Sequence, residues 1–176
     1  MPADLELILV APHLSWLDET RRYIDAFRSL GMSHIPGLLP DSLLDDPPAL
    51  IEKVNAFSRG DGLPPGWVPS TTWFGVRGST LVGNINVRHQ LVPALENFGG
   101  HVGYAVHPDH RKQGHASRML QLVLPEARNL GLQRLLFTCD DANLASARVI
   151  EKNGGTLQDK LPRDGGGLTR RYWIQL

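Results

Sequence analysis

The segment from Val102 to Ala116 constrains the fold of this chain more than any other. Apolar residues alternate with small ones up to Val106, which predicts a strand, and Pro108 ends that pattern. Beyond Gly114, apolar residues recur every three or four positions, which predicts an amphipathic helix. The sequence therefore predicts a strand, a tight turn and a helix in direct succession.

The turn between this strand and this helix has the composition of an anion-binding site. The first amide groups of a helix have no partners within the helix and carry a partial positive charge. Gly114 has no Cβ and Ala116 has a small side chain, so an anion can approach the main chain there. Arg111 and Lys112 add positive charge. Pyrophosphate is a usual ligand of such a turn, although an ordinary solvated turn can have the same composition.

The residues after this helix extend the pattern. Residues 135–139 form an apolar run typical of a buried strand, and a short helix is predicted from Asn143 to Lys152. The motif Asn153-Gly154-Gly155 then ends that helix. The order is therefore strand, anion-binding turn, helix, strand, helix.

The first half of the chain predicts a strand, two helices and a hairpin, separated by loops. The strand is expected at 5–10, the helices at 15–30 and 48–58, and the hairpin at 72–89 with its turn at Gly78-Ser79. Loops are expected at the acidic stretch 41–46 and at the Gly/Pro-rich stretch 60–69, which contains Trp67.

The Arg-x-x-Gly-x-Ala turn, together with Asn143, Ser146 and Asn153-Gly154, resembles the acetyl-CoA-binding half of the GNAT family of N-acetyltransferases. The resemblance runs from about Gly100 to Gly155. Segments 65–72 and 170–174 also resemble a bacterial subgroup of predicted acetyltransferases. The resemblance implies an α+β fold in a single domain, residues 1–176. It further implies a mixed, mostly antiparallel sheet of about seven strands flanked by about four helices.

Composition sets limits that agree with this resemblance. A length of 176 residues suits one domain, and the formal net charge of zero gives no overall attraction to nucleic acid or to an anionic membrane. Cys139 is the only cysteine, which excludes an internal disulfide and fits a reducing cytoplasm. The N-terminus does not have the pattern of a signal peptide, and no apolar run reaches the ~20 residues of a membrane span. We expect a cytoplasmic protein.

The resemblance implies a site for acetyl-CoA as the co-substrate. The turn would hold the pyrophosphate, the strand end at Tyr104 and Val106 would pair with the pantetheine arm, and the Val106 N–H would face the thioester oxygen as an oxyanion contact. Asn143 matches a family position that binds the pantetheine, and Ser146 lies one helical turn further; by sequence alone, Asn143 is equally a helix N-cap. The residues expected at the turn are Arg111, Lys112, Gln113, Gly114, His115 and Ala116.

One position departs from the family pattern. Many GNAT enzymes have a tyrosine seven residues after the asparagine, where it protonates the leaving thiolate, but this chain has Ile150 there. Either another group supplies the proton or none is needed, because a thiol with a pKa of about 8.5 is already a fair leaving group. Tyr104 and Tyr172 are the candidate substitutes.

An amine acceptor must lose a proton before it attacks, and three residues are candidate bases. Histidine has a pKa of about 6.5, which suits that role. His101 opens the strand before the turn and is the first candidate; His89 is the second, and Glu96 in the intervening loop is the third. Arg88 is a candidate to orient a carboxylate of the acceptor. Trp67 is a candidate acceptor contact, or else a side chain that anchors its loop.

Other chemistries fit the sequence less well. Cys139 lies in an apolar strand without a histidine at a recognisable spacing, so a buried structural thiol is favoured over a nucleophile. His107, His110 and His115 lie in three different predicted elements, so no metal site is expected.

Two functional classes stay open. One is an N-acetyltransferase that acts on a small molecule or on a peptide amino group by direct attack in a ternary complex. The other is a CoA-binding sensor or interaction module that has lost the chemistry, for which Ile150 is the main argument. The sequence does not decide between a monomer and a homodimer, although many family members are dimers.

Overall fold

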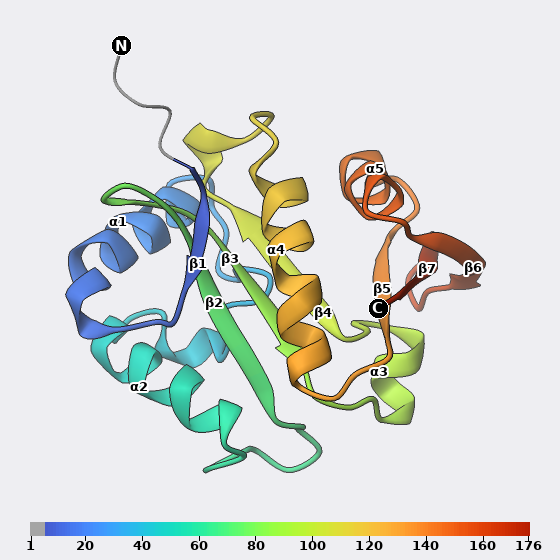
Figure 1. Cartoon of the computed structure of the whole chain (residues 1–176), viewed down its shortest axis with the longest axis horizontal. Coiled ribbons are helices and arrows are strands. Elements are labelled where there is room, and N and C mark those ends of the chain that lie inside the picture. The colour runs from blue at the N-terminus through green and yellow to red at the C-terminus, as the bar shows by residue number, and fades with distance from the viewer. Residues whose placement is uncertain (1–5) are drawn as a thin grey trace.

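Two antiparallel sheets, which meet at one end and diverge at the other, form the frame of the protein (Figure 1). The computed structural model describes residues 6–176. The first sheet has the strand order β1-β2-β3-β4, and the second has the order β5-β7-β6. The α+β fold implied by the resemblance is confirmed. Within the described part of the chain, seven strands are divided between two sheets and are accompanied by five α-helices.

The elements follow one another in the order that the sequence predicts through the central region. The strands are β1 (Ile8–Val10), β2 (Ser70–Arg77), β3 (Thr80–Arg88), β4 (Val102–Val106), β5 (Arg134–Asp140), β6 (Thr156–Pro162) and β7 (Leu168–Gln175). The α-helices are α1 (Leu17–Arg28), α2 (Pro47–Ser58), α3 (Pro93–Asn97), α4 (His115–Asn129) and α5 (Leu144–Lys152). Short 3-10 turns are η1 (Leu14–Trp16), η2 (Asp41–Leu43) and η3 (Pro108–His110).

Several boundaries differ from those predicted. The first helix was expected from residue 15, but residues 14–16 form the 3-10 turn η1. Leu5, with which the first strand was expected to begin, lies outside the described residues. The acidic stretch 41–46 is not wholly a solvated loop, because it contains η2 and the buried side chain of Leu44. The hairpin turn at Gly78-Ser79 is confirmed by the pairing of Arg77 with Thr80.

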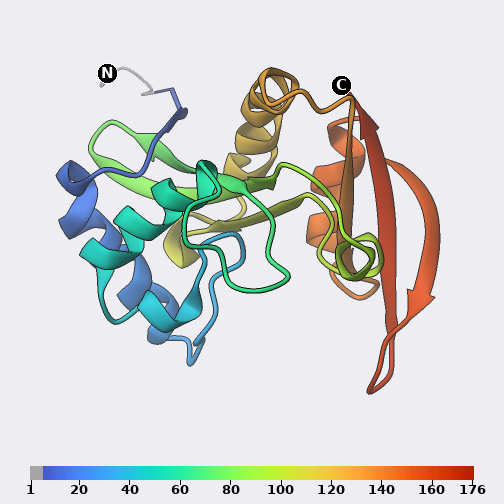
Figure 2. The same ribbon diagram turned by 90° about the horizontal axis from the view of Figure 1, so that it is seen from below.

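Helices cover both faces of the first sheet (Figures 1 and 2). On one face, α1 and α2 bury apolar side chains such as Tyr23, Phe27 and Leu50 against β2 and β3. On the other face, α4 buries Met119 and its apolar neighbours in a second cluster that also includes side chains of β5 and α5. Each such fully buried side chain contributes about 1.5–3 kcal/mol. The second cluster fixes α4, and therefore the turn before it, against the sheet.

Two glycines in the first sheet allow α4 to lie close to it. A Cβ on Gly83 would lie 2.6 Å from the Met119 methyl carbon, and one on Gly75 would lie 2.5 Å from the Met119 sulfur. Any larger residue at either position would push the methionine, and with it the helix, away from the strands. These two glycines thus allow the close approach of α4 to β2 and β3.

Strands β4 and β5 are joined only at the base of the space between them, which we call the wedge. The His101 amide donates to the Leu136 carbonyl at 2.8 Å, and the Gly99 amide donates to the Thr138 hydroxyl at 2.8 Å. Beyond this joint the two strands belong to different sheets, and Figure 1 shows them separating toward the N-terminal end of α4. Gly100 suits the joint because a Cβ there would lie 2.4 Å from the Leu136 carbonyl oxygen.

Candidate donor and acceptor site

The amide and carbonyl groups of β4 that face the wedge form no hydrogen bonds with β3. In an antiparallel pair, alternate residues direct their amide and carbonyl groups toward the partner strand. The His107 amide donates to the Val82 carbonyl of β3 at 2.9 Å, so the amides of Val106 and Tyr104 point to the other edge, toward β5. The Val106 N–H is therefore directed into the wedge, where an acyl carbonyl oxygen would need a donor.

The turn before α4 has the backbone of an anion-binding site. Lys112 has a φ of 61° and Gly114 a φ of 83°, and two left-handed residues in one short turn direct successive amides to one side. Gly114 caps α4 without any side chain, and a Cβ at this position would have nothing within 4 Å. The first helical bond of α4 runs from the Arg118 amide to the Gly114 carbonyl at 3.0 Å. The amides before Arg118 thus face open space at a positive helix end.

A cavity of about 290 Å³ lies beside this turn, between α4 and α5. Arg118 and Lys152 supply positive charge to it, and the Asn153 side chain donates to the Ser117 hydroxyl at 3.1 Å, which ties the two helices together. Basic side chains next to a helix N-terminus suit a phosphate-bearing ligand. Asn153 thus belongs to the wall of this cavity, as does Gly114.

Arg111 and Gln113 turn back toward the protein rather than over the turn. The Arg111 guanidinium lies 5.7 Å from the centre of the Phe27 ring, and its Nε donates to the Val106 carbonyl at 3.4 Å. The Gln113 side chain donates to the Asp109 carbonyl at 3.3 Å. These contacts stiffen the turn, so its amides rather than these two side chains form the anion-facing surface.

Tyr104 and Ser146 meet across the wedge. The Tyr104 hydroxyl, on β4, lies 2.7 Å from the Ser146 hydroxyl, on α5. Burial raises the pKa of Tyr104 to about 12, although the Ser146 hydrogen bond opposes that rise. The tyrosine is therefore neutral at pH 7 and is able to donate a proton. The Cys139 thiol lies beside this pair, and burial also raises its pKa.

The other two positions considered for a proton donor, Ile150 and Tyr172, are buried. Ile150 is 1% exposed and packs in the core, where its methyl group lies 2.4 Å from the position of a Cβ on Gly155. The Tyr172 side chain is also buried, and its hydroxyl donates to Glu151 at 2.8 Å. Of the tyrosines named from the sequence, Tyr104 is the one that reaches the wedge.

Asn143 caps α5. Its side-chain oxygen accepts a hydrogen bond from the Ser146 amide at 3.1 Å, which is the N-cap role that the sequence also allows. This bond holds Ser146, and so the Tyr104–Ser146 contact, at the first turn of α5. Whether Asn143 also binds pantetheine stays a prediction.

His101 serves the joint between the sheets. The Leu136 amide donates to its Nδ1 at 2.8 Å, and its ring lies 6.3 Å from the Trp173 ring. Burial, together with the charges of Arg88 and Arg134, lowers the pKa of His101 to about 4. A neutral ring that accepts at Nδ1 carries its proton at Nε2, so no free lone pair is left to take a proton from an amine. This geometry disfavours His101 as the base.

The other polar candidates lie apart from His101. The His89 ring is bonded to the Thr71 hydroxyl at 2.8 Å, on the β2 side of β3, and burial lowers its pKa. His89 follows Arg88, whose amide donates to the His101 carbonyl at 2.8 Å, but the two histidine rings bond to different partners. Glu96 is exposed on α3, where its carbonyl accepts from Arg171 at 3.0 Å.

Arg88 and Trp67 have structural contacts in the described residues. The Arg88 guanidinium donates to the carbonyls of Gly99 and Gly100, at 3.2 and 3.0 Å, and so supports the loop that enters the joint. Trp67 is 40% exposed, and its ring lies 5.7 Å from that of Phe57 on α2. These contacts fit the loop-anchoring alternative for Trp67, and neither acceptor role is tested by them.

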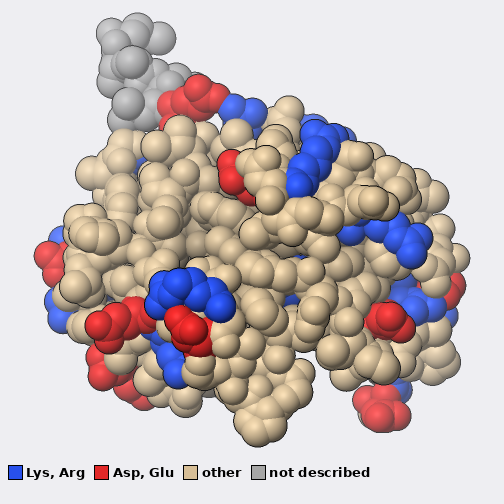
Figure 3. Space-filling model, turned by 60° about the horizontal axis from the view of Figure 1, so that its bottom comes forward, with Lys and Arg blue, Asp and Glu red and all other residues tan. Residues whose placement is uncertain are grey.

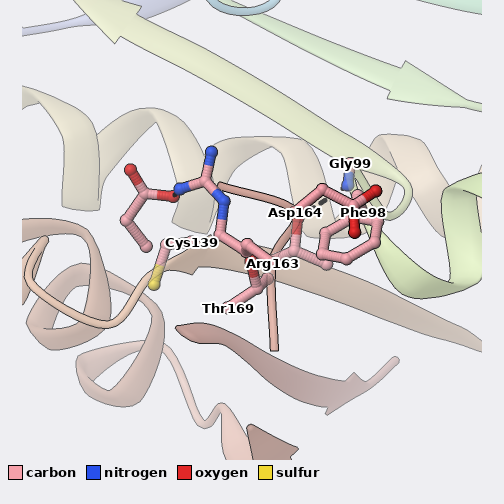
Figure 4. A pocket seen from close by; sticks show the side chains of 8 residues that line it. Phe98, Gly99, Cys139, Arg163, Asp164 and Thr169 are labelled. Carbon is pink, nitrogen blue, oxygen red and sulfur yellow. Dashed lines mark hydrogen bonds and ion pairs between the residues drawn. The ribbon is translucent and has the colours of Figure 1, made fainter. Parts of the chain in front are cut away.

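A second cavity, of about 350 Å³, lies beside β5 and was not predicted from the sequence (Figure 4). Phe98 and Gly99 line it from the loop after α3, Cys139 lines it from β5, and Arg163 and Asp164 line it from the turn between β6 and β7. Arg163 forms an ion pair with Asp140, which also lines this cavity. The signal that the sequence offered was the polar turn before Gly165-Gly166-Gly167, which carries no recognised motif.

Charges of both signs are interspersed on the molecular surface (Figure 3). Within residues 6–176, no helix is long and apolar enough to span a membrane. In the same part of the chain, no three His, Cys, Asp or Glu side chains gather as they would around a metal ion.

Comparison with known proteins identifies the family to which this chain belongs. A family model described as the GNAT acetyltransferase domain matches residues 46–156, which is more than half of the chain. The chain therefore belongs to the GNAT family of acetyltransferases. No match was found among curated proteins.

Solved structures support the same fold at low sequence identity. The microcin C7 self-immunity acetyltransferase MccE, in complex with acetyl-CoA and AMP, is 14% identical; the match covers 97% of this chain and 93% of that one, with a TM-score of 0.72. The ribosomal L7/L12 α-N-protein acetyltransferase RimL, in complex with CoA, is 16% identical over 99% and 97%, with a TM-score of 0.70. Mycobacterium smegmatis RimJ, in complex with CoA-disulfide, is 17% identical over 96% and 81%, with a TM-score of 0.72.

Proposed function

We propose that this chain transfers an acetyl group from acetyl-CoA to a primary amine of a small molecule or a peptide. The observation that carries the proposal is the wedge, with the unpaired edge of β4 on one side and the anion-binding turn at its open end. This arrangement offers main-chain donors for an extended chain of amides, and positive charge for a pyrophosphate. That RimL, RimJ and MccE were crystallised with CoA or acetyl-CoA supports this choice of donor.

The donor is proposed to lie along the wedge with its pyrophosphate on the turn. The amides of residues 111–116 hold the pyrophosphate, and the cavity between α4 and α5 takes the nucleotide end. The strand end at Tyr104 and Val106 lies along the pantetheine with its wedge-side main-chain groups, of which the Tyr104 amide is a donor, and Asn143 and Ser146 border it from α5. The Val106 N–H faces the carbonyl oxygen and stabilises the charge that develops there.

The reaction is proposed to proceed by direct attack in a ternary complex. The ammonium gives a proton to the base, for which Glu96 is the candidate, the nitrogen bonds to the thioester carbon, and the C–S bond breaks with its electron pair on sulfur. The second proton of the nitrogen passes to water, which also restores the Tyr104 hydroxyl after it has protonated the thiolate. The Tyr104 hydroxyl protonates the leaving thiolate, and Ser146 holds that hydroxyl at 2.7 Å. Tyr104 thus takes the role for which Ile150 is unsuitable.

The acceptor is proposed to enter from the cavity beside β5. Phe98 offers an apolar contact for a carbon chain, and the Asp140 carboxylate, which is paired with Arg163, would exchange that partner for the ammonium of the acceptor. Glu96 lies two residues before Phe98, and it is the predicted base that we place nearest to this cavity. The His89 ring is hydrogen-bonded to Thr71 on the β2 side of β3, and the His101 ring accepts a hydrogen bond from Leu136 at the joint. RimL modifies a protein α-amino group, which keeps peptides among the acceptor classes to be tested.

The domain organisation, the cofactor requirement, the location and the oligomeric state are proposed from the sequence and from the matched structures. The matched structures cover 96–99% of this chain, which supports a single domain over residues 1–176. Without any metal, the proposed reaction needs acetyl-CoA and the amine alone. A cytoplasmic location, and a homodimer as the alternative to a monomer, are carried forward from the sequence.

One assay separates an enzyme from a CoA-binding sensor. Free thiol released from acetyl-CoA is measured against a panel of small amines, amino acids and peptides with free N-termini. We expect amine-dependent release for at least one class, and abolition of that release by N-methylation to the tertiary amine. Tight CoA binding without turnover on any amine would favour the sensor and refute the enzyme.

A further inference from the structure

A third cavity, of about 400 Å³, lies on the other flank of the α4 N-terminus, away from α5. Its walls come from the residues just before β1, from the end of β2, and from the start of α4 with the two residues before it. Arg77, His115 and Arg118 give it basic groups, Glu6 gives it one acidic group, and the amide-bearing turn residue Gly114 closes one side. Nothing in the proposed transfer reaction uses this cavity.

His115 is the feature of this cavity that calls for a ligand. The side chain is 7% exposed, and its Nε2 has no hydrogen-bond partner among the residues that the structure describes. Buried polar atoms in folded proteins are almost always paired, because leaving one unpaired costs most of its hydration energy. His115 lines the cavity, but its Nε2 has almost no accessible surface, so the ring has to rotate before a group in the cavity bonds to this nitrogen. The cost of leaving the nitrogen unpaired favours that rotation when an acceptor enters the cavity.

The charges around His115 identify the kind of group. Burial lowers the pKa of His115, and the positive charges of Arg77 and His110 lower it further. The ring is thus neutral, with one N–H to donate, and it lies in a positive field. Glu6 offsets part of that field through its ion pair with Arg118, whereas the partial charge of the α4 N-terminus adds to it. The field and the available donors favour an anion.

We propose that this cavity binds a phosphate monoester, with Nε2–H of His115 donating to a phosphate oxygen and Arg77 supplying charge. A tetrahedral dianion accepts bonds from several directions at once, which matches donors from a helix end, a strand turn and an imidazole. Two sources share this chemistry: the 3′-phosphate of CoA, and a free phosphate or phosphorylated metabolite. The first source rests on the proposed use of acetyl-CoA, and the second does not.

The test compares two pairs of measurements on the full chain. Isothermal titration gives the Kd of CoA and of 3′-dephospho-CoA. A second titration adds inorganic phosphate at constant ionic strength. The protein is first saturated with 3′-dephospho-CoA, so that the pyrophosphate turn is already occupied. If that ligand does not bind, phosphate is added to the free protein. The variants are Arg77→Gln and His115→Leu. The control is Arg59→Gln, an exposed arginine that directly follows α2 and pairs with Asp61.

If the 3′-phosphate is the occupant, wild type binds CoA at least tenfold tighter than 3′-dephospho-CoA. Arg77→Gln brings that ratio close to one by weakening CoA alone. If a free phosphate is the occupant, the two cofactors bind equally and inorganic phosphate binds saturably, and either variant weakens the phosphate at least tenfold while Arg59→Gln does not.

The proposal is overturned if wild type neither distinguishes the two cofactors nor binds phosphate. Binding that both variants leave unaltered also overturns it, because the anion then lies elsewhere. Should His115→Leu fail to fold, Arg77→Gln decides alone. A chain that binds phosphate but no CoA refutes the proposed function while supporting this site, so the two failures are distinguishable.

Discussion

Replacing His101 separates a structural histidine from a catalytic base. In His101→Leu, the Leu136 amide loses its acceptor at the buried joint between β4 and β5. A buried donor left unpaired costs about 1–3 kcal/mol, to which the lost packing against Trp173 adds. We expect His101→Leu to lower the free energy of unfolding by about 2–4 kcal/mol at pH 7.5. His101→Asn offers a side-chain oxygen as the acceptor and should lose less than half of that.

The pH dependence of stability has a defined sign. The folded-state pKa of His101 is lowered to about 4, below the unfolded value of about 6.5. The protonated ring is thus disfavoured in the folded state, so stability is fully present above pH 6.5 and is lost as the pH falls from 6.5 to 4. A separation of about 2.5 units corresponds to at most about 3 kcal/mol. The variants should show a smaller loss over this window than wild type.

The assays are urea unfolding at a series of pH values and the pH profile of kcat/KM for acetyl transfer. If His101 is structural, His101→Asn keeps the shape and the midpoint of the acidic limb. The reasoning is refuted if His101→Asn is as stable as wild type but abolishes that limb, since a general base would then have been removed without damage to the joint.

Three further predictions concern the donor site and the loop beside β4. Gly114→Glu places bulk and negative charge at the turn and should weaken CoA at least a hundredfold, or about 3 kcal/mol, by isothermal titration; unaltered affinity would show that the pyrophosphate lies elsewhere. Tyr104→Phe should lower kcat about 10–100-fold with little change in the KM of acetyl-CoA, and the loss should shrink when an acyl donor with a more acidic thiol is used; an unchanged kcat would exclude the tyrosine as the proton donor. Gly37→Ala should lower the free energy of unfolding in urea by about 3 kcal/mol, because Gly37 has a φ of 75° and a Cβ there would lie 2.3 Å from the Gly103 carbonyl oxygen. The matched variant Gly131→Ala has a φ of 85° but open space around it, so it should cost only about 1 kcal/mol.

The parts of the fold that the sequence predicted are those with local signals. The strand from Val102 to Val106, the turn at Gly114 and the helix after it all follow from periodicity and from one glycine. The five-residue helix α3 is too short to show a period, and β6 is a mostly exposed edge strand without an apolar alternation, so neither was predicted. Short or solvated elements are fixed by their neighbours rather than by their own residues.

The site was predicted less completely, for a physical reason. The turn and the Asn143 cap are contacts between residues close in sequence. By contrast, the Tyr104–Ser146 bond joins residues 42 apart, and the bond that occupies His101 joins residues 35 apart. No local sequence pattern predicts such pairs, because they form only when the two sheets meet. The sequence therefore predicted the turn at Gly114 but assigned His101 a role that its distant partner does not favour.

The division of strands between the sheets has a consequence for how the protein is made. All strands of the first sheet lie between residues 8 and 106, and all strands of the second lie between residues 134 and 175. No pairing within either sheet has to wait for the other, and chains fold from the N-terminus during synthesis. The first sheet is therefore able to form on the ribosome while the second is still unmade. The wedge comes into being last, when the second sheet docks through the joint at Leu136. A chain stalled before that point has the apolar cluster beneath α1 and α2, but it lacks the wedge and the part of the α4 cluster that β5, α5 and β7 supply.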